Sequence, residues 1–294
     1  MKRKKKAGPN YNRYGWAFIA AAFLLYLIFT IYPAAESLAL AFQSLEGGKY
    51  VFVGLKNFKR MFGDAIFLQS LKNTFLYMII QVPVMLMLAL LLAVLLNSRF
   101  LKWKGMFRTS IFLPCVTSLV AYSILFKMMF SLDGIVNQLL MHLGILDQPY
   151  QYLQNSVWAR AVIIIAMLWR WTGYNVIFYL SALQNIPKET FEAARVDGAN
   201  AAQTLFRVTI PQLKPIVLLT AIMSTNGTLQ LFDETMNITQ GGPANSTLTV
   251  SHYIYNQSFV YAPNFGYASA ISYMVVFLMI ILAVIQFSVA GKEG

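Results

Sequence analysis

The sequence has few charged residues and very few acidic ones. Charged residues make up 12% of its 294 residues, and only 11 are Asp or Glu, whereas a soluble domain carries about 25% charged residues. With 58% hydrophobic residues, the chain is neither disordered nor an ordinary soluble enzyme. Its 23 Lys and Arg give a net charge of +12, and a basic, apolar chain is typical of an integral membrane protein in contact with anionic lipid.

A nucleic-acid-binding domain is the alternative explanation for a basic composition. Such a domain gathers its Lys and Arg on one soluble face, whereas here they stand between long apolar runs. We therefore expect the lipid bilayer, and no nucleic acid, as a partner.

Cysteine and histidine are nearly absent. Cys115 is the only cysteine, so no intrachain disulfide can form, and its apolar neighbours suggest a small hydrophobic residue. His142 and His252 lack metal-ligand spacing, and no nucleophile with a base is apparent. The chain also lacks the Gly-x-x-x-x-Gly-Lys-[Ser/Thr] phosphate loop. We expect no metal, no cofactor, no catalytic residue and no enzymatic activity in this chain.

Six apolar runs are long enough to span a bilayer, which takes about 20 residues. They cover 16–40, 73–96, 110–130, 157–183, 216–232 and 266–290. The prediction is an all-α integral membrane protein with six transmembrane helices. It divides into a basic N-terminal segment (1–15), a transmembrane domain (16–290) and a short tail (291–294). The first run exceeds a cleaved signal sequence in length, so we expect an uncleaved anchor, with cleavage near the small residues 33–35 as the alternative.

Basic residues predict the orientation, because cytoplasmic loops are enriched in Lys and Arg. Fifteen of the 23 basic residues lie on the cytoplasmic side if the N-terminus is inside. An even number of spans then places both termini in the cytoplasm. The first outer loop departs from this rule, and its residues 54–62 predict a short amphipathic helix on the membrane surface or against a partner.

The connection 184–215 is longer and more patterned than the other loops. Pro187 and Glu189 are typical of a helix start, and a short helix is predicted over 190–196. Asp197-Gly198 predicts a turn, because glycine can adopt the left-handed conformation. With a second helix predicted over 199–208, this loop forms a helix–turn–helix projection that either docks a partner or lies on the membrane.

This loop resembles the EAA loop of ABC-importer permeases. The resemblance rests on Glu192-Ala193-Ala194, Gly198 and Val-Thr-Ile-Pro at 208–211, where Val208 and Ile210 are conservative departures. Residues 169–174, 183–189 and 232–247 are similar to carbohydrate permeases, in particular to the first of two paired sugar permeases of the maltose, multiple-sugar and glycerol-3-phosphate type. The resemblance extends over about 14–292.

The resemblance implies a type I ABC-importer permease fold and a subunit of an ATP-driven, binding-protein-dependent carbohydrate importer in a bacterial or archaeal cell membrane. The implied partners are a second homologous permease, two ATP-binding subunits that hold ATP and Mg, an extracytoplasmic solute-binding protein and a sugar. The implied site of ATPase coupling consists of Glu192, Ala193, Ala194, Asp197 and Gly198.

Polar residues within the spans suggest a solute pathway, because such groups are costly in lipid and usually face a protein interior or water. In the fifth span they recur on one helix face, and aromatic, amide and carboxylate groups can match a sugar's apolar faces and hydroxyls. The predicted pathway residues are Trp171, Thr172, Gly173, Asn175, Asn226, Thr228, Gln230, Leu231, Asp233 and Glu234.

Four of these residues, Thr172, Gly173, Thr228 and Leu231, are carried over from related permeases by position. The alternative for the whole set is ordinary helix packing and interfacial anchoring. Arg170, a charge inside a span, is expected to make an inter-helix contact or support a gate. A stand-alone secondary transporter or channel for a small polar solute is the alternative function, but such proteins often contain internal repeats and none is apparent.

Overall fold

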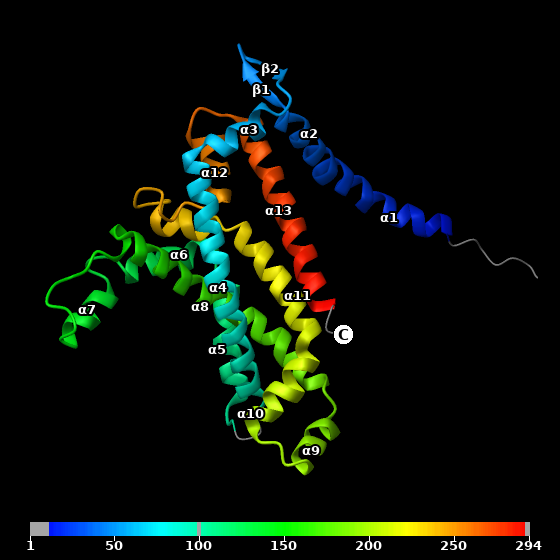
Figure 1. Cartoon of the computed structure of the whole chain (residues 1–294), viewed down its shortest axis with the longest axis vertical. Helices are drawn as coiled ribbons and strands as arrows, with labels where there is room; N and C mark the ends of the chain where they lie inside the picture. Colours follow the sequence, from blue (N-terminus) through cyan, green and yellow to red (C-terminus); the bar gives the residue numbers. More distant parts are fainter. Residues whose placement is uncertain (1–11, 99–100, 292–294) are drawn as a thin grey trace, which may run out of the picture.

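The computed structural model describes residues 12–98 and 101–291. The chain forms an elongated bundle of long helices, with a β-hairpin at one end and short helices at the other (Figure 1). Its elements are, in chain order, α1 (Asn12–Tyr26), the π-helical turn η1 (Leu27–Ile31), α2 (Tyr32–Ala41), β1 (Gln43–Glu46), β2 (Lys49–Phe52), α3 (Lys56–Gly63), α4 (Ala65–Asn97), α5 (Lys104–Val116), α6 (Leu119–Met129), α7 (Ile135–His142), the 3-10 turn η2 (Tyr152–Gln154), α8 (Ser156–Asn185), α9 (Lys188–Val196), α10 (Ala201–Thr204), η3 (Leu205–Thr209), α11 (Ile210–Leu229), η4 (Thr235–Thr239), α12 (Val250–Tyr255), η5 (Asn256–Val260) and α13 (Phe265–Gly291).

Five helices in the described part of the chain are long and apolar enough to cross a membrane. They comprise Tyr14–Ala41, Ala65–Asn97, Ser156–Asn185, Ala201–Leu229 and Phe265–Val289. The pair α5 and α6 passes the same test jointly but is bent by 99°, so the total is six if this pair is one span. The predicted apolar runs therefore all form helices, and α8 and α13 match their predicted ranges closely.

The third apolar run does not form the single helix that we predicted over 110–130. Helix α5 ends soon after Pro114, whose ring nitrogen cannot donate a helical hydrogen bond. Thr117 is extended, and its hydroxyl donates to the Pro114 carbonyl over 2.6 Å. Ser118 then caps the start of α6. The chain thus breaks where a proline removes a helical hydrogen bond and two hydroxyl side chains satisfy freed backbone groups.

The fifth span also differs from its prediction. It is helical from Ala201 onward and ends at Leu229, short of the predicted residue 232. The carbonyls of Leu229 and Leu231 accept hydrogen bonds from Ser251 and Thr249, at 3.4 and 2.5 Å. These contacts come from a segment 18 or more residues further along the chain, so a periodic pattern cannot reveal where the helix stops.

Helix α4 is the central helix of the bundle and packs against α8 and α11. Small residues, Ala89 and Ala93, let α8 and α11 approach it and bury Tyr179 and Leu213. The Tyr179 hydroxyl lies 2.8 Å from the hydroxyl of Thr220, which joins α8 to α11. These contacts hold the three helices that surround the candidate site.

The all-α prediction is corrected at one end of the molecule, where β1 and β2 form an antiparallel hairpin. The side chain of Asn57, on α3, donates to the carbonyls of Ala41 and Gln43 and so holds the base of this hairpin. The short helix predicted near 54–62 is present as α3. Its apolar side is divided, because Met61 is fully buried whereas Phe62 is 72% exposed.

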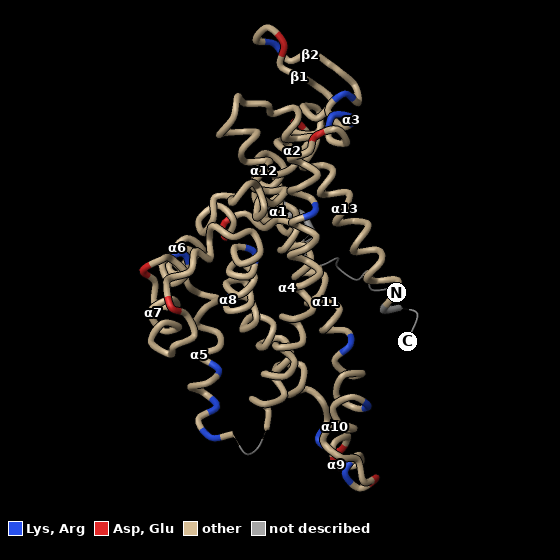
Figure 2. Tube along the Cα trace, turned by 60° about the vertical axis from the view of Figure 1, so that its left-hand side comes forward, with Lys and Arg blue, Asp and Glu red and all other residues tan. Residues whose placement is uncertain are grey.

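Charged residues are concentrated at the hairpin end and at the α9–α10 end of the molecule, with a smaller group at α6 and α7 (Figure 2). Helix α1 extends away from the other helices (Figure 1), and large apolar side chains along it are exposed. The placement of the charges and the exposed apolar side chains are both expected of a protein whose middle part faces lipid. The basic residues of 1–11, Arg99 and the tail 292–294, which contribute to the predicted orientation and domain limits, lie outside the described residues.

Candidate functional site

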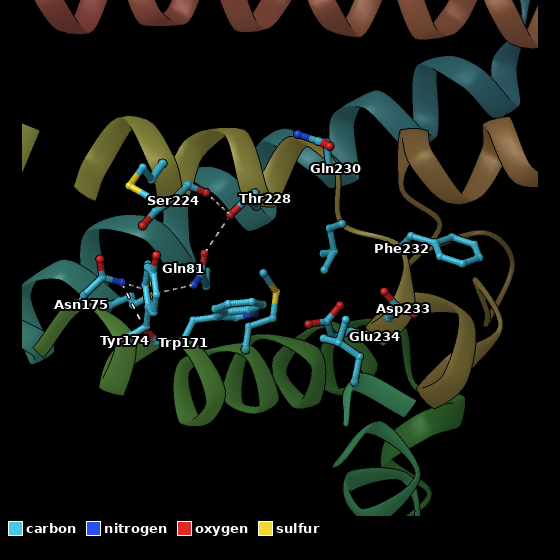
Figure 3. Close-up of a pocket in the computed structure, with 16 residues that line it drawn as sticks. Gln81, Trp171, Tyr174, Asn175, Ser224, Thr228, Gln230, Phe232, Asp233 and Glu234 are labelled. Carbon is cyan, nitrogen blue, oxygen red and sulfur yellow. Dashed lines mark hydrogen bonds between the residues drawn. The ribbon is translucent and has the colours of Figure 1, made fainter. Parts of the chain in front are cut away.

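A pocket of about 300 Å³ lies between α4, α8 and the end of α11 (Figure 3). It combines amide, hydroxyl and carboxylate groups with aromatic and methionine side chains. Its lining consists of Gln81, Met85, Leu119, Met167, Trp171, Tyr174, Asn175, Met223, Ser224, Gly227, Thr228, Gln230, Leu231, Phe232, Asp233 and Glu234. A concave, mostly apolar site with a few convergent polar groups is the usual form of a small-molecule site.

One end of the pocket is a hydrogen-bonded group of uncharged side chains. The Thr228 hydroxyl lies 3.1 Å from the Gln81 carbonyl oxygen and 2.9 Å from the carbonyl of Ser224. Asn175 donates to the carbonyl of Trp171 over 3.2 Å. Figure 3 shows these residues converging from three helices. The contacts hold amide and hydroxyl groups at the pocket surface, where a sugar hydroxyl could pair with them.

The other end of the pocket is acidic. Asp233 and Glu234 follow the end of α11, and their side chains lie next to each other near Trp171 (Figure 3). Glu234 is 3% exposed and accepts a short hydrogen bond from the Tyr122 hydroxyl of α6. Trp171 makes an edge contact with Tyr174, with ring centroids 6.4 Å apart. The pocket therefore places an indole ring between neutral and acidic hydrogen-bonding groups.

Arg170 stabilises the break between α5 and α6. Its Nη1 atom donates to the carbonyls of Pro114 and Thr117, at 3.1 and 2.6 Å, and so binds the carboxyl end of α5. Its guanidinium also lies over the rings of Tyr122 and Trp171, 4.9 and 5.1 Å from their centroids. The expected inter-helix contact of Arg170 is thus confirmed.

Seven predicted pathway residues line this pocket, and three do not. The seven are Trp171, Asn175, Thr228, Gln230, Leu231, Asp233 and Glu234. Thr172 and Asn226 are absent from the lining, and Thr172 is buried. Gly173 contacts α5 instead, because a Cβ atom there would lie 1.9 Å from the carbonyl oxygen of Ile111.

The prediction that the polar residues of the fifth span share one helix face is wrong, because α11 ends at Leu229. Asn226 lies within the helix, Gln230 is its C-terminal cap, and Asp233 and Glu234 begin the next helical turn. They therefore do not share one helix face. In Figure 3 Gln230 points away from the acidic pair. The acids reach the pocket only because the chain changes direction at 230–232.

Sequence reasoning missed the contribution of α4. Gln81 and Met85 line the pocket from this helix and are fully buried. Gln81 interrupts the apolar run Ile79-Ile80-Gln81-Val82, and an amide in the middle of a span is the kind of costly residue that indicates function. No comparable signal distinguishes Leu119, Met167, Met223 or Phe232 from ordinary packing residues.

The implied coupling residues lie on α9 and the turn after it. Gly198 has a φ of +75°, as the predicted turn requires. Its amide donates to the Arg195 carbonyl and that of Ala199 to the Ala194 carbonyl, which together form a Schellman motif. Asn200 and Gln203 next form a capping box that starts α10. Local hydrogen bonds therefore hold this turn.

The predicted coupling residues differ in solvent exposure. Glu192, Ala193, Asp197 and Gly198 are exposed, whereas Ala194 is buried. Val196, which the prediction omitted, is 87% exposed at the end of α9. Exposed apolar and acidic groups side by side form a surface that another protein could cover.

The second half of this loop is helical, but it does not form the separate helix that we predicted over 199–208. Helix α10, η3 and α11 form one continuous helical run of 29 residues, Ala201–Leu229. At 1.5 Å per residue this run is about 43 Å long. The turn at Gly198 therefore directly precedes one end of this run, and the pocket residues Ser224 and Thr228 lie near its other end.

This architecture, apolar helices of membrane length around an internal polar pocket, is that of a multi-pass membrane transport protein. Residues 65–291 match the family described as binding-protein-dependent transport system inner membrane component. LacF, a lactose transport system permease protein of Rhizobium radiobacter, is 50% identical over 285 residues, which cover 96% of both chains. AraP, an arabinooligosaccharides transport system permease protein of Halalkalibacterium halodurans, is 32% identical over 95% of this chain and 89% of its own.

The chain belongs to this family of inner-membrane transport components. It is a permease subunit of an ABC importer and not an enzyme. Its fold is similar to that of a solved bacterial ABC transporter involved in the import of the acidic polysaccharide alginate, with a TM-score of 0.85, 22% identity, and coverage of 96% of this chain and 97% of that one. A second solved form of the alginate transporter, in complex with an alginate pentasaccharide-bound periplasmic protein, also has a TM-score of 0.85 at 21% identity, over 97% of this chain and 96% of that one.

Proposed function

We propose that this chain forms half of the translocation pathway of an ATP-driven, binding-protein-dependent sugar importer. The proposal is supported by relatives named for transport of lactose and arabinooligosaccharides. The observation that carries it is the continuous helix Ala201–Leu229, which joins an exposed turn to a pocket suited to a sugar. The chain is the membrane-spanning permease, and it is a subunit of a larger complex.

The chain crosses the cytoplasmic membrane of a bacterium or archaeon six times, with both termini inside. Counting the bent pair α5 and α6 as one span supports this number. Lys and Arg residues lie at the start of α5 and around α9 and α10, at one end of the molecule (Figure 2). That end is cytoplasmic by the positive-inside rule, and it carries the turn at Gly198.

The coupling surface consists of Glu192, Ala193, Ala194, Asp197 and Gly198, with Val196 added because of its exposure. An ATP-binding subunit covers this surface, and its movement displaces α9 against the start of the 29-residue run. Helical hydrogen bonds join the residues of this run into one element, so that its two ends move together. Ser224 and Thr228 then move with it at the pocket.

Three kinds of partner complete the importer. A second homologous permease supplies the other half of the pathway, and two ATP-binding subunits hold ATP and Mg. An extracytoplasmic solute-binding protein delivers the sugar at the end that bears the hairpin. This chain carries no cofactor of its own in the cycle.

The pocket is the part of the pathway that contacts the sugar. The indole of Trp171 stacks on an apolar sugar face, and Thr228, Gln81 and Asn175 pair with hydroxyl groups. Gln230, Leu231, Asp233 and Glu234 line the same space. Thr172, Gly173 and Asn226 act next to the pathway by holding the helices that form it.

The test compares two glycines with the same backbone requirement at different places. Gly198 and Gly144 have φ values of +75° and +68°, and nothing lies within 4 Å of where a Cβ would be in either. Gly198→Val should abolish transport and transport-linked ATP hydrolysis in proteoliposomes that contain the assembled importer. Gly144→Val, in the loop after α7, bears a similar strain and should retain both activities.

Two results would count against the proposal. Normal transport by Gly198→Val would remove the coupling role from this turn. Sugar uptake by the chain in liposomes that lack ATP-binding subunits would instead favour the stand-alone transporter. Assembly of each variant, measured by co-purification of the partner permease, distinguishes uncoupling from failed insertion.

A further inference from the structure

The charge of the pocket lining is strongly one-sided. Among the 16 described residues that line it, two are acidic, Asp233 and Glu234, and none is Lys or Arg. The chain as a whole has the opposite balance, with 23 basic and 11 acidic residues. The net charge of the pocket lining is therefore negative, whereas the net charge of the whole protein is positive.

Arg170 forms no ion pair with either acid of this end. Its guanidinium lies beside Trp171, 5.1 Å from the ring centroid, but it is not part of the lining. Its Nη1 atom is already bound by the carbonyls of Pro114 and Thr117. The residue is 6% exposed, so it offers no accessible cation to a negatively charged solute.

The two acids have different surroundings. Glu234 is buried and accepts a hydrogen bond from Tyr122. Asp233 is half-buried, and no side chain in the described part of the chain donates a hydrogen bond to its carboxylate. Asp233 thus presents an open acceptor to the pocket, whereas the Glu234 carboxylate is bound by Tyr122. Figure 3 shows Glu234 beside Asp233, on the side toward Trp171.

We infer that this half of the pathway admits uncharged glycosides and excludes solutes that carry carboxylate or phosphate groups, with Asp233 as the main specificity-determining residue. The inference rests on the proposed function, because it takes the pocket to be the solute pathway. Sugar hydroxyls can donate to both carboxylates. An anion about 10 Å from one like charge, at an effective dielectric constant of about 20, is disfavoured about tenfold.

Thiol modification measures the charge selectivity of the pocket without any sugar or binding protein. In a Cys115→Ala background, Ser224→Cys or Gly227→Cys places a thiol on the pocket wall. The assembled importer is treated with three methanethiosulfonate reagents, which are uncharged, anionic (sulfonate) and cationic (ammonium). Mass spectrometry of the tryptic peptide gives each rate, normalised to the rate with free cysteine.

The anionic reagent should react about tenfold more slowly than the uncharged one, and the cationic reagent at least as fast. Asp233→Asn should remove most of this difference, and raised salt should reduce it. Asp147→Asn is the matched control, because it removes the same charge from an exposed loop outside the pocket lining, and it should leave the ratio unchanged.

Three outcomes would overturn the inference. The first is equal normalised rates for anionic and uncharged reagents at both thiols. The second is a selectivity that Asp233→Asn and Asp147→Asn change equally. The third is a failure of both thiols to react with the uncharged reagent in every nucleotide state, which would show that the pocket is not aqueous. The proposed function is tested separately by transport, so an importer that transports sugar but lacks this selectivity refutes only the charge filter.

Discussion

Gly173 and Gly227 are both glycines inside apolar helices, yet replacement by alanine should have opposite effects on stability. A Cβ at Gly173 would lie 1.9 Å from the Ile111 carbonyl oxygen and 2.9 Å from its carbon, whereas real Cβ atoms essentially never approach closer than 3.0 Å. Because both obstacles are backbone atoms, α5 and α8 must separate. At Gly227 nothing lies within 4 Å of the added atom.

The magnitudes follow from two competing effects. Alanine stabilises a helix interior by about 0.5–1 kcal/mol relative to glycine, and this is the whole effect expected for Gly227→Ala. Overpacking of a close contact costs about 1–3 kcal/mol, and sometimes more. Given the backbone overlap, we expect Gly173→Ala to lower the free energy of unfolding by about 2 kcal/mol net.

Cys115 provides the assay for this prediction. It is the only cysteine, it is half-buried, and its thiol donates to the Arg170 carbonyl over 2.9 Å, between α5 and α8. A thiol-reactive dye therefore reports separation of these helices during thermal unfolding in detergent. Gly173→Ala should lower the transition temperature and Gly227→Ala should raise it slightly. A neutral or stabilising Gly173→Ala would refute the close contact of α5 and α8.

Three further predictions concern charge, pH and capping. Arg170→Met should cost about 3–5 kcal/mol because it removes two hydrogen bonds from a charged group, to the carbonyls of Pro114 and Thr117. Thr117→Val should cost about 1 kcal/mol, and a similar cost for both variants would contradict this. Burial lowers the pKa of His252 to about 4. The contribution of the neutral ring to the free energy of unfolding is therefore complete above about pH 6.5 and is about 2 kcal/mol smaller at pH 5. The fall of Tm over this pH range should be absent in His252→Gln. Asn200→Ala should cost about 1 kcal/mol at the α10 cap, measurable as faster amide hydrogen exchange at 201–204.

Local chemistry accounts for what sequence reasoning predicted correctly. Long apolar runs need no tertiary information to form helices in lipid, since every backbone group must be paired within the segment. Helices α8 and α13 follow from this rule alone. The turn at Gly198 also follows from local rules, because the residue type, the left-handed conformation and the flanking hydrogen bonds all lie within a few residues.

Helix ends inside the membrane could not be predicted in this way. The break after α5 is held by Arg170, 53 residues away from Thr117, and the end of α11 is held by Thr249 and Ser251. In both cases a distant side chain supplies the hydrogen bond that the helix gives up. The hydrophobic pattern of the sequence continues through these positions, so it does not indicate where the helix ends.

The sequence by itself determined the class of molecule: apolar runs of membrane length, basic flanks and one patterned loop, each set by the composition of a short segment. Tertiary structure alone decided which polar residues meet. Gln81 joins the pocket from α4, Gly173 allows the backbones of α5 and α8 to approach closely, and Asp233 and Glu234 reach the pocket past the end of a helix. The physical reason is that a pocket is formed by side chains from several helices, and their relative placement depends on packing contacts far apart in the chain.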